Sequence, residues 1–154
     1  MTVQLFRGSV EVLVWATIAN GGLKTTDRAH TKRLLTVTNR RWGGFSAPGG
    51  KIDEGESPDV AAARELKEET GLTALRLVQI GGAVHASQPK DNSYPWFCLA
   101  FLADVGAQRP SRQEEGTEIG WHTPSDLRND GLYPDFYDKI FPIAAIHYSK
   151  RLKK

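Results

Sequence analysis

Cysteine and long apolar runs are scarce in this sequence. Cys98 is the only cysteine among 154 residues, which excludes an internal disulfide. No apolar run approaches the roughly 20 residues of a membrane-spanning helix, and the start of the sequence lacks the basic and then apolar order of a secretory signal. Together these absences predict a protein that works in the reducing cytoplasm and has no membrane partner.

Net charge is also small. The 20 lysine and arginine residues nearly balance the 18 aspartate and glutamate residues, whereas strong non-specific binding of nucleic acid usually needs a broad basic face. We therefore do not expect nucleic acid as a partner, and we interpret the basic residues at 150–154 as a solvated chain end. There is no internal repeat and no linker, so the length suits one domain over residues 1–154.

Side-chain types and turn residues predict the order of strands and helices. Segments rich in β-branched and aromatic residues are expected to form strands at residues 11–19, 32–38, 75–86, 94–104 and 117–122. Residues 40–50, with four glycines and one proline, predict a loop or a very short strand. Helices are expected at residues 57–70, 124–127 and 133–148, and Pro142 should kink or restart the last of them. This order suits a mixed sheet with helices packed on its faces.

The helix expected at residues 57–70 carries a dense acidic face. Seven of the 18 acidic residues fall within residues 53–69. At about 100° per residue, three of them share one sector of the helix, namely Glu65, Glu68 and Glu69. Neighbouring like charges repel each other. Either solvation of the face or a bound divalent cation with oxygen ligands, such as Mg2+, would relieve that repulsion.

The ends of this helix are also marked in the sequence. Ser57 suits the N-cap position, and Pro58 suits the first turn because its missing N–H is not needed there. Gly71 suits the left-handed residue that ends a helix.

The segment that leads into this helix and forms it resembles the signature of a known family. Residues 50–72 read GKIDEGESPDVAAARELKEETGL, which matches at every fixed position the Nudix box, G-x5-E-x7-R-E-U-x-E-E-x-G-U with U aliphatic. The segments 47–50 (APGG) and 118–121 (EIGW) also resemble the family. The resemblance implies an α/β protein of the Nudix fold, an α/β/α sandwich around a mixed β-sheet. It also implies a MutT-like hydrolase that cleaves a nucleoside diphosphate bond.

The resemblance further implies a role for each residue that matches the box. The implied metal ligands are the carbonyl of Gly49 and the carboxylates of Glu65, Glu68 and Glu69, with Glu56 joining through water or an added metal. The implied metal is Mg2+, for which Mn2+ can substitute. In catalysis, Arg64 orients the glutamates and Glu65 holds the metal, while Glu68 is our first choice for the base. Family members differ in this last role, so later loop residues stay open as bases: Glu114, Glu115 and Glu118.

The box leaves the identity of the substrate open. The segment from Arg41 to Phe45 resembles MutT-like triphosphate enzymes. It favours a nucleoside triphosphate, oxidised purine nucleotides included, that yields the monophosphate and pyrophosphate. Pro89 lies one position from the proline typical of ADP-ribose enzymes, and Tyr94 lies too far along for the tyrosine typical of dinucleoside polyphosphate enzymes. ADP-ribose, nucleotide sugars and dinucleoside polyphosphates therefore remain alternatives. A non-catalytic nucleotide-binding domain is a minor one, since all box glutamates are present.

Several residues outside the box are candidates to contact such a small-molecule nucleotide. Aromatic side chains can stack on a base and arginine can hold phosphates, although each of these residues also has a plain packing or solvated explanation. The candidates are Arg41, Trp42, Phe45, His85, Trp96, Glu118 and Trp121. Many members of the family pair, so a homodimer is left open. The near-neutral charge counts against an enzyme that removes caps from RNA ends.

Overall fold

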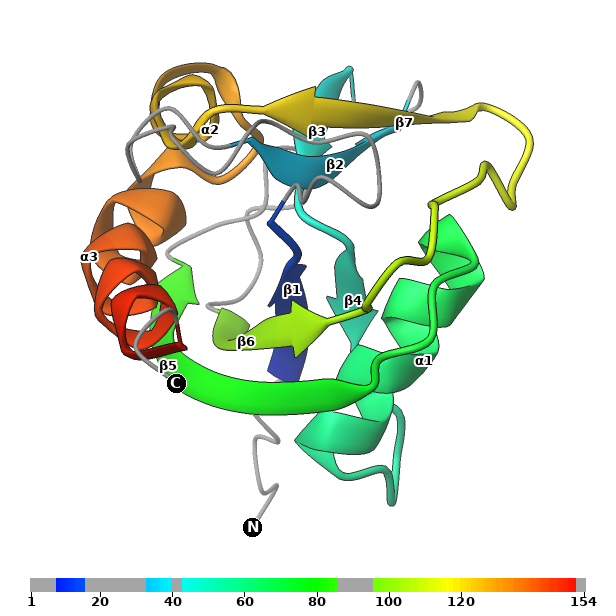
Figure 1. The fold of residues 1–154 in the computed structure, drawn as a ribbon, viewed down its shortest axis with the longest axis horizontal. Coiled ribbons are helices and arrows are strands. Elements are labelled where there is room, and N and C mark those ends of the chain that lie inside the picture. Colours follow the sequence, from blue (N-terminus) through cyan, green and yellow to red (C-terminus); the bar gives the residue numbers. More distant parts are fainter. Residues whose placement is uncertain (1–7, 16–32, 40–42, 86–95, 152–154) are drawn as a thin grey trace, which may run out of the picture.

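A computed structural model describes residues 8–15, 33–39, 43–85 and 96–151 of the chain (Figure 1). The strands in these residues are β1 (Gly8–Leu13), β2 (Leu34–Asn39), β3 (Gly44–Ser46), β4 (Gly49–Lys51), β5 (Arg76–His85), β6 (Trp96–Asp104) and β7 (Thr117–His122). The helices are α1 (Pro58–Thr70), α2 (Pro124–Asp130) and α3 (Pro134–Arg151). None of these three helices is both long and apolar enough to cross a membrane.

The strands form two sheets. The larger sheet has the order β4-β1-β6-β5, in which β1 and β6 run parallel and the other neighbours run antiparallel. The smaller sheet has the order β3-β2-β7 and is antiparallel. The two sheets meet beyond the end of β1, where Leu35 N donates to Val14 O at 2.8 Å and Trp15 forms an isolated bridge with Leu34. The larger sheet is therefore mixed, as expected.

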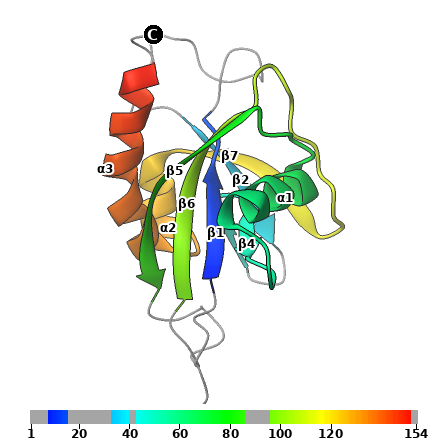
Figure 2. The same ribbon diagram turned by 90° about the horizontal axis from the view of Figure 1, so that it is seen from below.

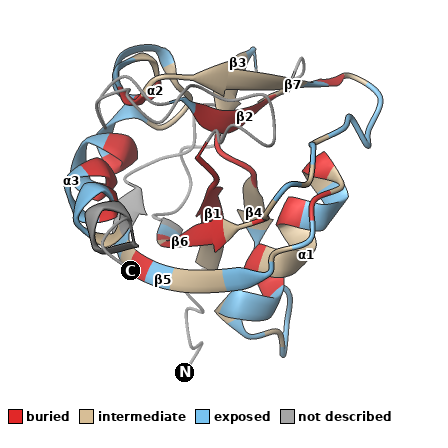
Figure 3. Cartoon of the chain, viewed as in Figure 1, coloured by how far each residue is buried: buried red, intermediate tan, exposed pale blue. Residues whose placement is uncertain are grey.

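Alternation of side chains along β1 builds a core on each face of the mixed sheet. Val10, Val12 and Val14 belong to the core on one face, and Leu13 and Trp15 belong to the core on the other. Helix α1 contributes Ala61, Ala62 and Leu66 to the first core, and α3 contributes Phe136, Tyr137, Ile140, Phe141 and Ala144 to the second. Figures 2 and 3 show the two helices on opposite sides of this sheet, with exposed residues on their outer surfaces. This arrangement is the α/β/α sandwich that the resemblance implied.

Helix α1 begins and ends close to its predicted limits. Gly71 ends the helix with φ 74°, and its N–H donates to Lys67 O at 2.9 Å. Ser57 takes the N-cap position, but its side chain makes no capping hydrogen bond and pairs with Asp59 instead. The buried stripe of the helix consists of Ala61, Ala62, Leu66 and Thr70. The acidic residues therefore lie beside the stripe and not within it.

Helix α3 corrects one of the two outcomes expected at Pro142, a restart of the helix. It runs as a single helix from Pro134 to Arg151, and Pro142 does not restart it. Pro142 cannot donate to the carbonyl of Asp138, but both residues lie on the exposed side of the helix. Water can therefore solvate that carbonyl, and the helix continues.

The other predicted elements agree with the structure to different degrees. The first strand begins earlier than predicted, at Gly8, and residues 16–19 of the prediction lie outside the described part of the chain. The four later predicted strands are confirmed to within two residues at each end. The glycine-rich segment contains two strands of three residues each, β3 and β4, and the helical turn predicted at 124–127 extends to Asp130.

Candidate active site

Two glycines allow β4 to lie close to β1 and to α1. Gly49 pairs with Glu11 in the ladder between β4 and β1. A Cβ atom at Gly49 would overlap the carbonyl oxygen of Val10, and a Cβ atom at Gly50 would overlap the carboxylate of Glu65. The absence of side chains at these two positions therefore lets the acidic face of α1 approach the backbone of β4.

Glu69 bonds to the backbone of Gly49, and no cationic side chain in the described part of the chain pairs with it. Its Oε2 accepts a hydrogen bond from Gly49 N at 2.9 Å. Burial, together with the charges of Glu65, Glu114 and Glu68, raises the pKa of Glu69 to about 8, although the bond from Gly49 opposes the shift. Within the described part of the chain, Glu69 forms no salt bridge with a lysine or an arginine. In its ionised form this partly buried carboxylate would therefore lack compensation from the described residues.

Arg64 bonds to three other acidic side chains near Glu69, namely Glu56, Glu65 and Glu68. Its Nε and Nη2 donate to the two oxygens of Glu56 at 2.8 and 2.9 Å. Its Nη1 donates to Glu65 Oε1 at 2.9 Å and to Glu68 Oε2 at 3.2 Å. Nη2 also donates to Lys51 O at 2.9 Å, which ties α1 to β4. These charge-assisted bonds hold three carboxylates in a defined arrangement around one guanidinium.

The pKa values separate the two groups of carboxylates. Hydrogen bonds from Arg64 and from the backbone of Asp53 lower the pKa of Glu56 to about 2, so Glu56 stays ionised at neutral pH. Burial raises the pKa of Glu65, although Arg64 opposes that shift. Ionisation is therefore disfavoured at Glu65 and Glu69, beside the glycines, and favoured at Glu56.

The structure brings the predicted metal ligands into one region but gives them different partners. Gly49, Glu65 and Glu69 meet at the turn, whereas both oxygens of Glu56 are bonded to Arg64 and the side chain of Glu68 is 53% exposed. Within the described residues, no three carboxylate, imidazole or thiol groups are close enough to hold one ion as they stand. The oxygen donors and the uncompensated charge of Glu69 nevertheless fit a hard divalent cation.

Two of the alternative bases, Glu114 and Glu115, lie in the loop between β6 and β7, and the third, Glu118, lies on β7. Ser111 N donates to the carbonyl oxygen of the last residue of α1 at 2.9 Å, which anchors the loop to the end of that helix. Glu114, three residues further on, is close enough for its charge to raise the pKa of Glu69. Glu115 and Glu118 are exposed. Of the three candidates, Glu114 is thus the one that acts electrostatically on Glu69.

Two of the predicted substrate contacts pack against different cores. The ring of Phe45 stacks on His122, with 3.8 Å between centroids and 9° between planes, and packs against the core beneath α3. Trp121 packs against the core beneath α1. One nucleobase therefore cannot lie between Phe45 and Trp121, and only one of them can belong to a given base site.

The remaining substrate candidates are less well placed by the structure. His85 ends β5 and lies opposite Trp96 in the ladder with β6, but the side chains of both residues lie outside the described part. Arg41 and Trp42 also fall outside the described residues. Their assignment as substrate contacts stays a prediction.

Sequence reasoning missed a buried acid beside the site. Glu11 is 6% exposed, burial raises its pKa, and Glu69 and Glu65 raise it further. Tyr137 donates its hydroxyl to Glu11 Oε2 at 2.7 Å. Tyr133 lies near the same charges, and burial together with Glu11, Cys98 and Glu69 raises its pKa to about 12. One signal was available, since a glutamate in the middle of an otherwise apolar strand needs a polar partner.

Sequence comparisons agree with this geometry. The family model of the NUDIX domain matches residues 14–142. The uncharacterized Nudix hydrolase YvcI of Bacillus subtilis is 33% identical over 121 residues, which are 76% of this chain and 72% of YvcI. The 8-oxo-(d)GTP phosphatase of Mycolicibacterium smegmatis is 34% identical over 112 residues, which are 72% of this chain and 33% of that protein. The ADP-ribose pyrophosphatase of B. subtilis is 54% identical over 72 residues, 47% of this chain and 39% of that protein. The chain therefore spans less than half the length of the last two relatives.

Solved structures agree on the fold. The NUDIX domain of NrtR from Shewanella oneidensis, determined with ADP ribose, aligns with a TM-score of 0.67 at 18% identity, covering 94% of this chain and 90% of that one. The MutT NUDIX hydrolase of Burkholderia pseudomallei aligns with a TM-score of 0.61 at 22% identity, covering 80% and 88%. The arrangement of two sheets and flanking helices is thus shared with both.

Proposed function

This chain belongs to the Nudix hydrolase family, and we propose that it uses Mg2+ to cleave a nucleoside triphosphate into the monophosphate and pyrophosphate. As a family member it is a hydrolase of phosphoric anhydride bonds, and the family uses divalent metal ions and small nucleotide substrates. Three features go beyond that membership: the identity of the metal, the residues that hold it and the molecule that is cleaved.

The metal assignment rests on the partly buried carboxylate of Glu69. It lies beside Glu65 and Gly49, and in the described residues no cationic side chain pairs with it. A bound divalent cation would compensate this charge, and Mg2+ prefers such hard oxygen ligands. We assign ligand roles to Glu65, Glu69 and the carbonyl of Gly49, and outer positions to Glu68 and Glu56.

Cleavage requires water to attack phosphorus while negative charge grows on the phosphate oxygens. A bound Mg2+ ion supplies positive charge against this change and makes water more acidic. Glu68, which is half exposed and bonded to Arg64 at 3.2 Å, is the residue to which we assign removal of the proton. Arg64 orients the carboxylates through its shared guanidinium. Glu114 is the alternative base, because its charge acts on Glu69.

A nucleoside triphosphate is the substrate that we favour. The M. smegmatis relative named as an 8-oxo-(d)GTP phosphatase aligns with 72% of this chain, which supports a purine triphosphate and oxidised purines in particular. Phe45 and Tyr133 are the side chains that we assign to the base, because both are half-buried and pack against the same core. Leu132 N donates to Phe45 O at 2.9 Å, which places Tyr133 next to the strand of Phe45.

ADP-ribose is the second candidate. The segment shared with the ADP-ribose pyrophosphatase of B. subtilis has a higher identity, 54% over 72 residues, than the longer alignments. The same metal site would serve for this substrate, because both molecules present a diphosphate to be cleaved. The two candidates therefore differ in what lies beyond the diphosphate and not in the reaction.

One panel of activity measurements decides between the candidates. The protein is incubated with Mg2+ and, in turn, 8-oxo-dGTP, dGTP, ADP-ribose, diadenosine tetraphosphate, UDP-glucose and 5′-triphosphate RNA, and the products are separated by anion-exchange chromatography. We expect pyrophosphate and a monophosphate from a purine triphosphate, and no product with EDTA. A higher kcat/KM for ADP-ribose would replace the substrate assignment. No hydrolysis of any compound would contradict the proposed function.

A further inference from the structure

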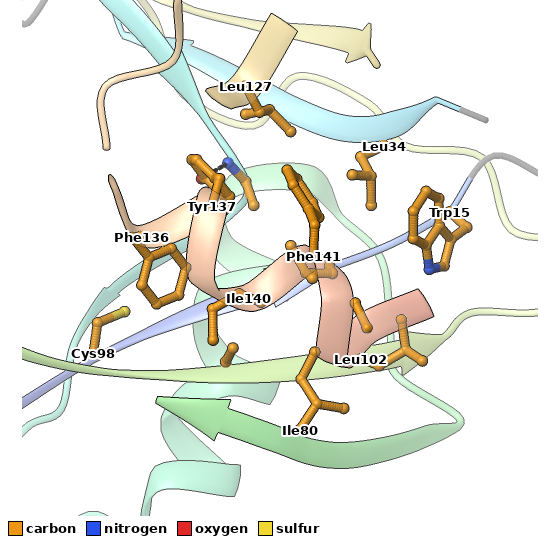
Figure 4. Packing of buried hydrophobic residues seen from close by; sticks show 14 residues of the cluster. Trp15, Leu34, Ile80, Cys98, Leu102, Leu127, Phe136, Tyr137, Ile140 and Phe141 are labelled. Atoms are coloured by element: carbon orange, nitrogen blue, oxygen red, sulfur yellow. Dashed lines mark hydrogen bonds between the residues drawn. The ribbon is translucent and has the colours of Figure 1, made fainter. Parts of the chain in front are cut away.

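One buried hydroxyl group connects α3 to the active site. Tyr137 is 0% exposed, and its hydroxyl donates to Glu11 Oε2 at 2.7 Å and accepts from Ala47 N at 2.7 Å. Figure 4 shows Tyr137 among the apolar residues of the core beneath α3. Since Glu11 belongs to β1 and Ala47 precedes Gly49 by two residues, the hydroxyl joins α3, β1 and the turn before β4.

The turn formed by residues 47–49 is held at each of its residues by a different element. Ala47 N donates to Tyr137 of α3, and Pro48 O accepts from Val12 N, next to Glu11 on β1, at 2.7 Å. Gly49 N donates to Glu69 of α1 at 2.9 Å. The last of these bonds orients the carboxylate that we assign to the metal. A displacement of Ala47 would therefore reach Glu69 across only two residues of backbone.

The need to fill the core does not by itself explain the hydroxyl of Tyr137. Phe136 and Phe141 occupy the same core on the same helix without a hydroxyl. If only volume were required at position 137, phenylalanine would avoid the need to bury a polar group. Removal of the hydroxyl would leave the N–H of Ala47, which is 1% exposed, and the carboxyl of Glu11 without this partner. Buried groups without partners are costly, so the surrounding turn would shift to find new ones.

We propose that Tyr137 and Glu11 are positioning residues of the reaction, which hold the turn at 47–49 and thereby orient Glu69 for metal binding. The inference rests on the proposed function, because it relies on the ligand role of Glu69. Neither residue is assigned a contact with the reacting atoms. A displacement of about 1 Å at a positioned group lowers rates by roughly 100-fold, so a small shift of the turn is sufficient for a large effect.

The substitution Tyr137→Phe tests the proposal, with Ile140→Ala as its matched control. Ile140 lies one turn further along α3, is 1% exposed and belongs to the same core, but no hydrogen bond of its side chain is involved. At a temperature where both variants are folded, Tyr137→Phe should lower kcat by roughly tenfold to 100-fold with KM little changed. Ile140→Ala should lower the melting temperature and leave kcat unchanged. Wild-type kcat in Tyr137→Phe, or equal losses in both variants, would overturn the proposal.

A pair of substitutions at Glu11 covers the case in which Tyr137→Phe does not fold. Glu11→Gln keeps a side-chain oxygen that can accept the hydroxyl bond, whereas Glu11→Met has a similar length and no such acceptor. We expect Glu11→Gln to retain most of kcat and Glu11→Met to lose it as Tyr137→Phe does. Equal kcat values in the two variants would overturn the role of the acceptor.

Two measurements that need no substrate separate this inference from the proposed function. Hydrogen exchange of the Gly49 amide in the metal-free protein should be faster in Tyr137→Phe than in wild type or Ile140→Ala. Binding of Mn2+, measured by electron paramagnetic resonance, should be weaker in Tyr137→Phe than in wild type or Ile140→Ala. If the wild type hydrolyses nothing in the nucleotide panel, the proposed function fails, and these two measurements still decide the role of Tyr137. Unchanged exchange and unchanged Mn2+ binding would overturn it.

Discussion

Arg64 and Gly49 both bond to carboxylates on α1 or just before it, and they have opposite effects on the pKa values of those carboxylates. Arg64 bonds to three carboxylates and lowers the pKa of Glu56 to about 2. Gly49 offers Glu69 only a backbone N–H, and the pKa of Glu69 is raised to about 8. The protein therefore neutralises the carboxylates around Arg64, whereas the described residues would not neutralise Glu69 in its ionised form.

This difference distinguishes the carboxylates that Arg64 orients from that of Glu69, and Glu65, which we also assign to the metal, belongs to the first group. The bonds around Arg64 are complete without any ligand, so Glu56, Glu65 and Glu68 keep their arrangement in the metal-free protein. At Glu69 a partly buried carboxylate favours protonation or pairing with a cation, because an unpaired charge removed from water is costly. Strongly shifted groups of this kind mark functional sites more often than structural ones.

The substitution Glu69→Gln should have the largest effect, because it removes the carboxylate that we assign to metal binding. The amide oxygen can still accept the bond from Gly49 N, so the fold should persist. The contribution of a bound metal is worth several kcal/mol, so kcat should fall by on the order of 1,000-fold at saturating Mg2+. Steady-state kinetics and a thermal melt measure the two effects. Glu54→Gln, at an exposed position, is the control, and near-normal turnover in Glu69→Gln would remove Glu69 from the ligand set.

The substitution Arg64→Lys tests whether the hydrogen bonds of Arg64 are needed to orient the carboxylates. Lysine keeps the charge but cannot bond to both oxygens of Glu56 and to two further carboxylates at once. Changes in groups that orient metal ligands typically cost 10- to 100-fold, and we expect kcat to fall by roughly that factor. Arg76→Lys, an exposed position on the edge strand β5, provides the control. Equal kinetics in the two variants would show that the arginine network is not needed to orient the cluster.

The pH dependence of metal binding should sharpen the comparison further. The folded protein keeps Glu69 protonated up to about pH 8, whereas an unfolded chain releases this proton near its ordinary pKa of 4.5. The contribution of Glu69 to stability in the metal-free protein therefore decreases as pH rises between these two values. Metal binding requires the ionised form, so Mg2+ affinity should rise from pH 6 to pH 8 by up to about tenfold per unit. Calorimetric titrations measure this, and a flat profile, or the same profile in Glu69→Gln, would contradict it.

The substitution Gly50→Ala should have the smallest effect of the four. The added Cβ would overlap the carboxylate of Glu65, and overpacking of this kind costs about 1–3 kcal/mol. Glu65→Asp withdraws the carboxylate by one carbon, so Gly50→Ala should cost less in that background. Denaturant unfolding of the four metal-free proteins gives the coupling free energy. A value near zero would show that the two residues do not compete for this space.

The acidic face of α1 could be predicted because a helix fixes the spacing of its residues. Glu65 and Glu69 lie one turn apart, and the structure places both beside Gly49 and Gly50. The sequence pattern did not indicate which of the glutamates Arg64 would engage, because that depends on where the residues before the helix lie. Glu56, expected near a metal, has both oxygens bonded to Arg64.

The contacts between distant segments could not be predicted from local patterns. Tyr137 and Glu11 are separated by 126 positions, and neither alternation nor helical periodicity links them. Likewise, the alternation of side chains along a strand does not predict that Phe45 and Trp121 pack against different cores. That depends on how the smaller sheet crosses the larger one. The polar partner of a buried glutamate is found only when the fold brings it near.

Anomalous diffraction from crystals grown with Mn2+ tests most directly whether Glu69 binds a metal ion. We predict a manganese peak in contact with a carboxylate oxygen of Glu69, next to Glu65 and the carbonyl of Gly49. In Glu69→Gln crystals the peak should be lost or much weaker, while the bonds between Arg64 and Glu56 remain. A peak that is absent from the wild type, or one that lies away from Glu69, would contradict this account.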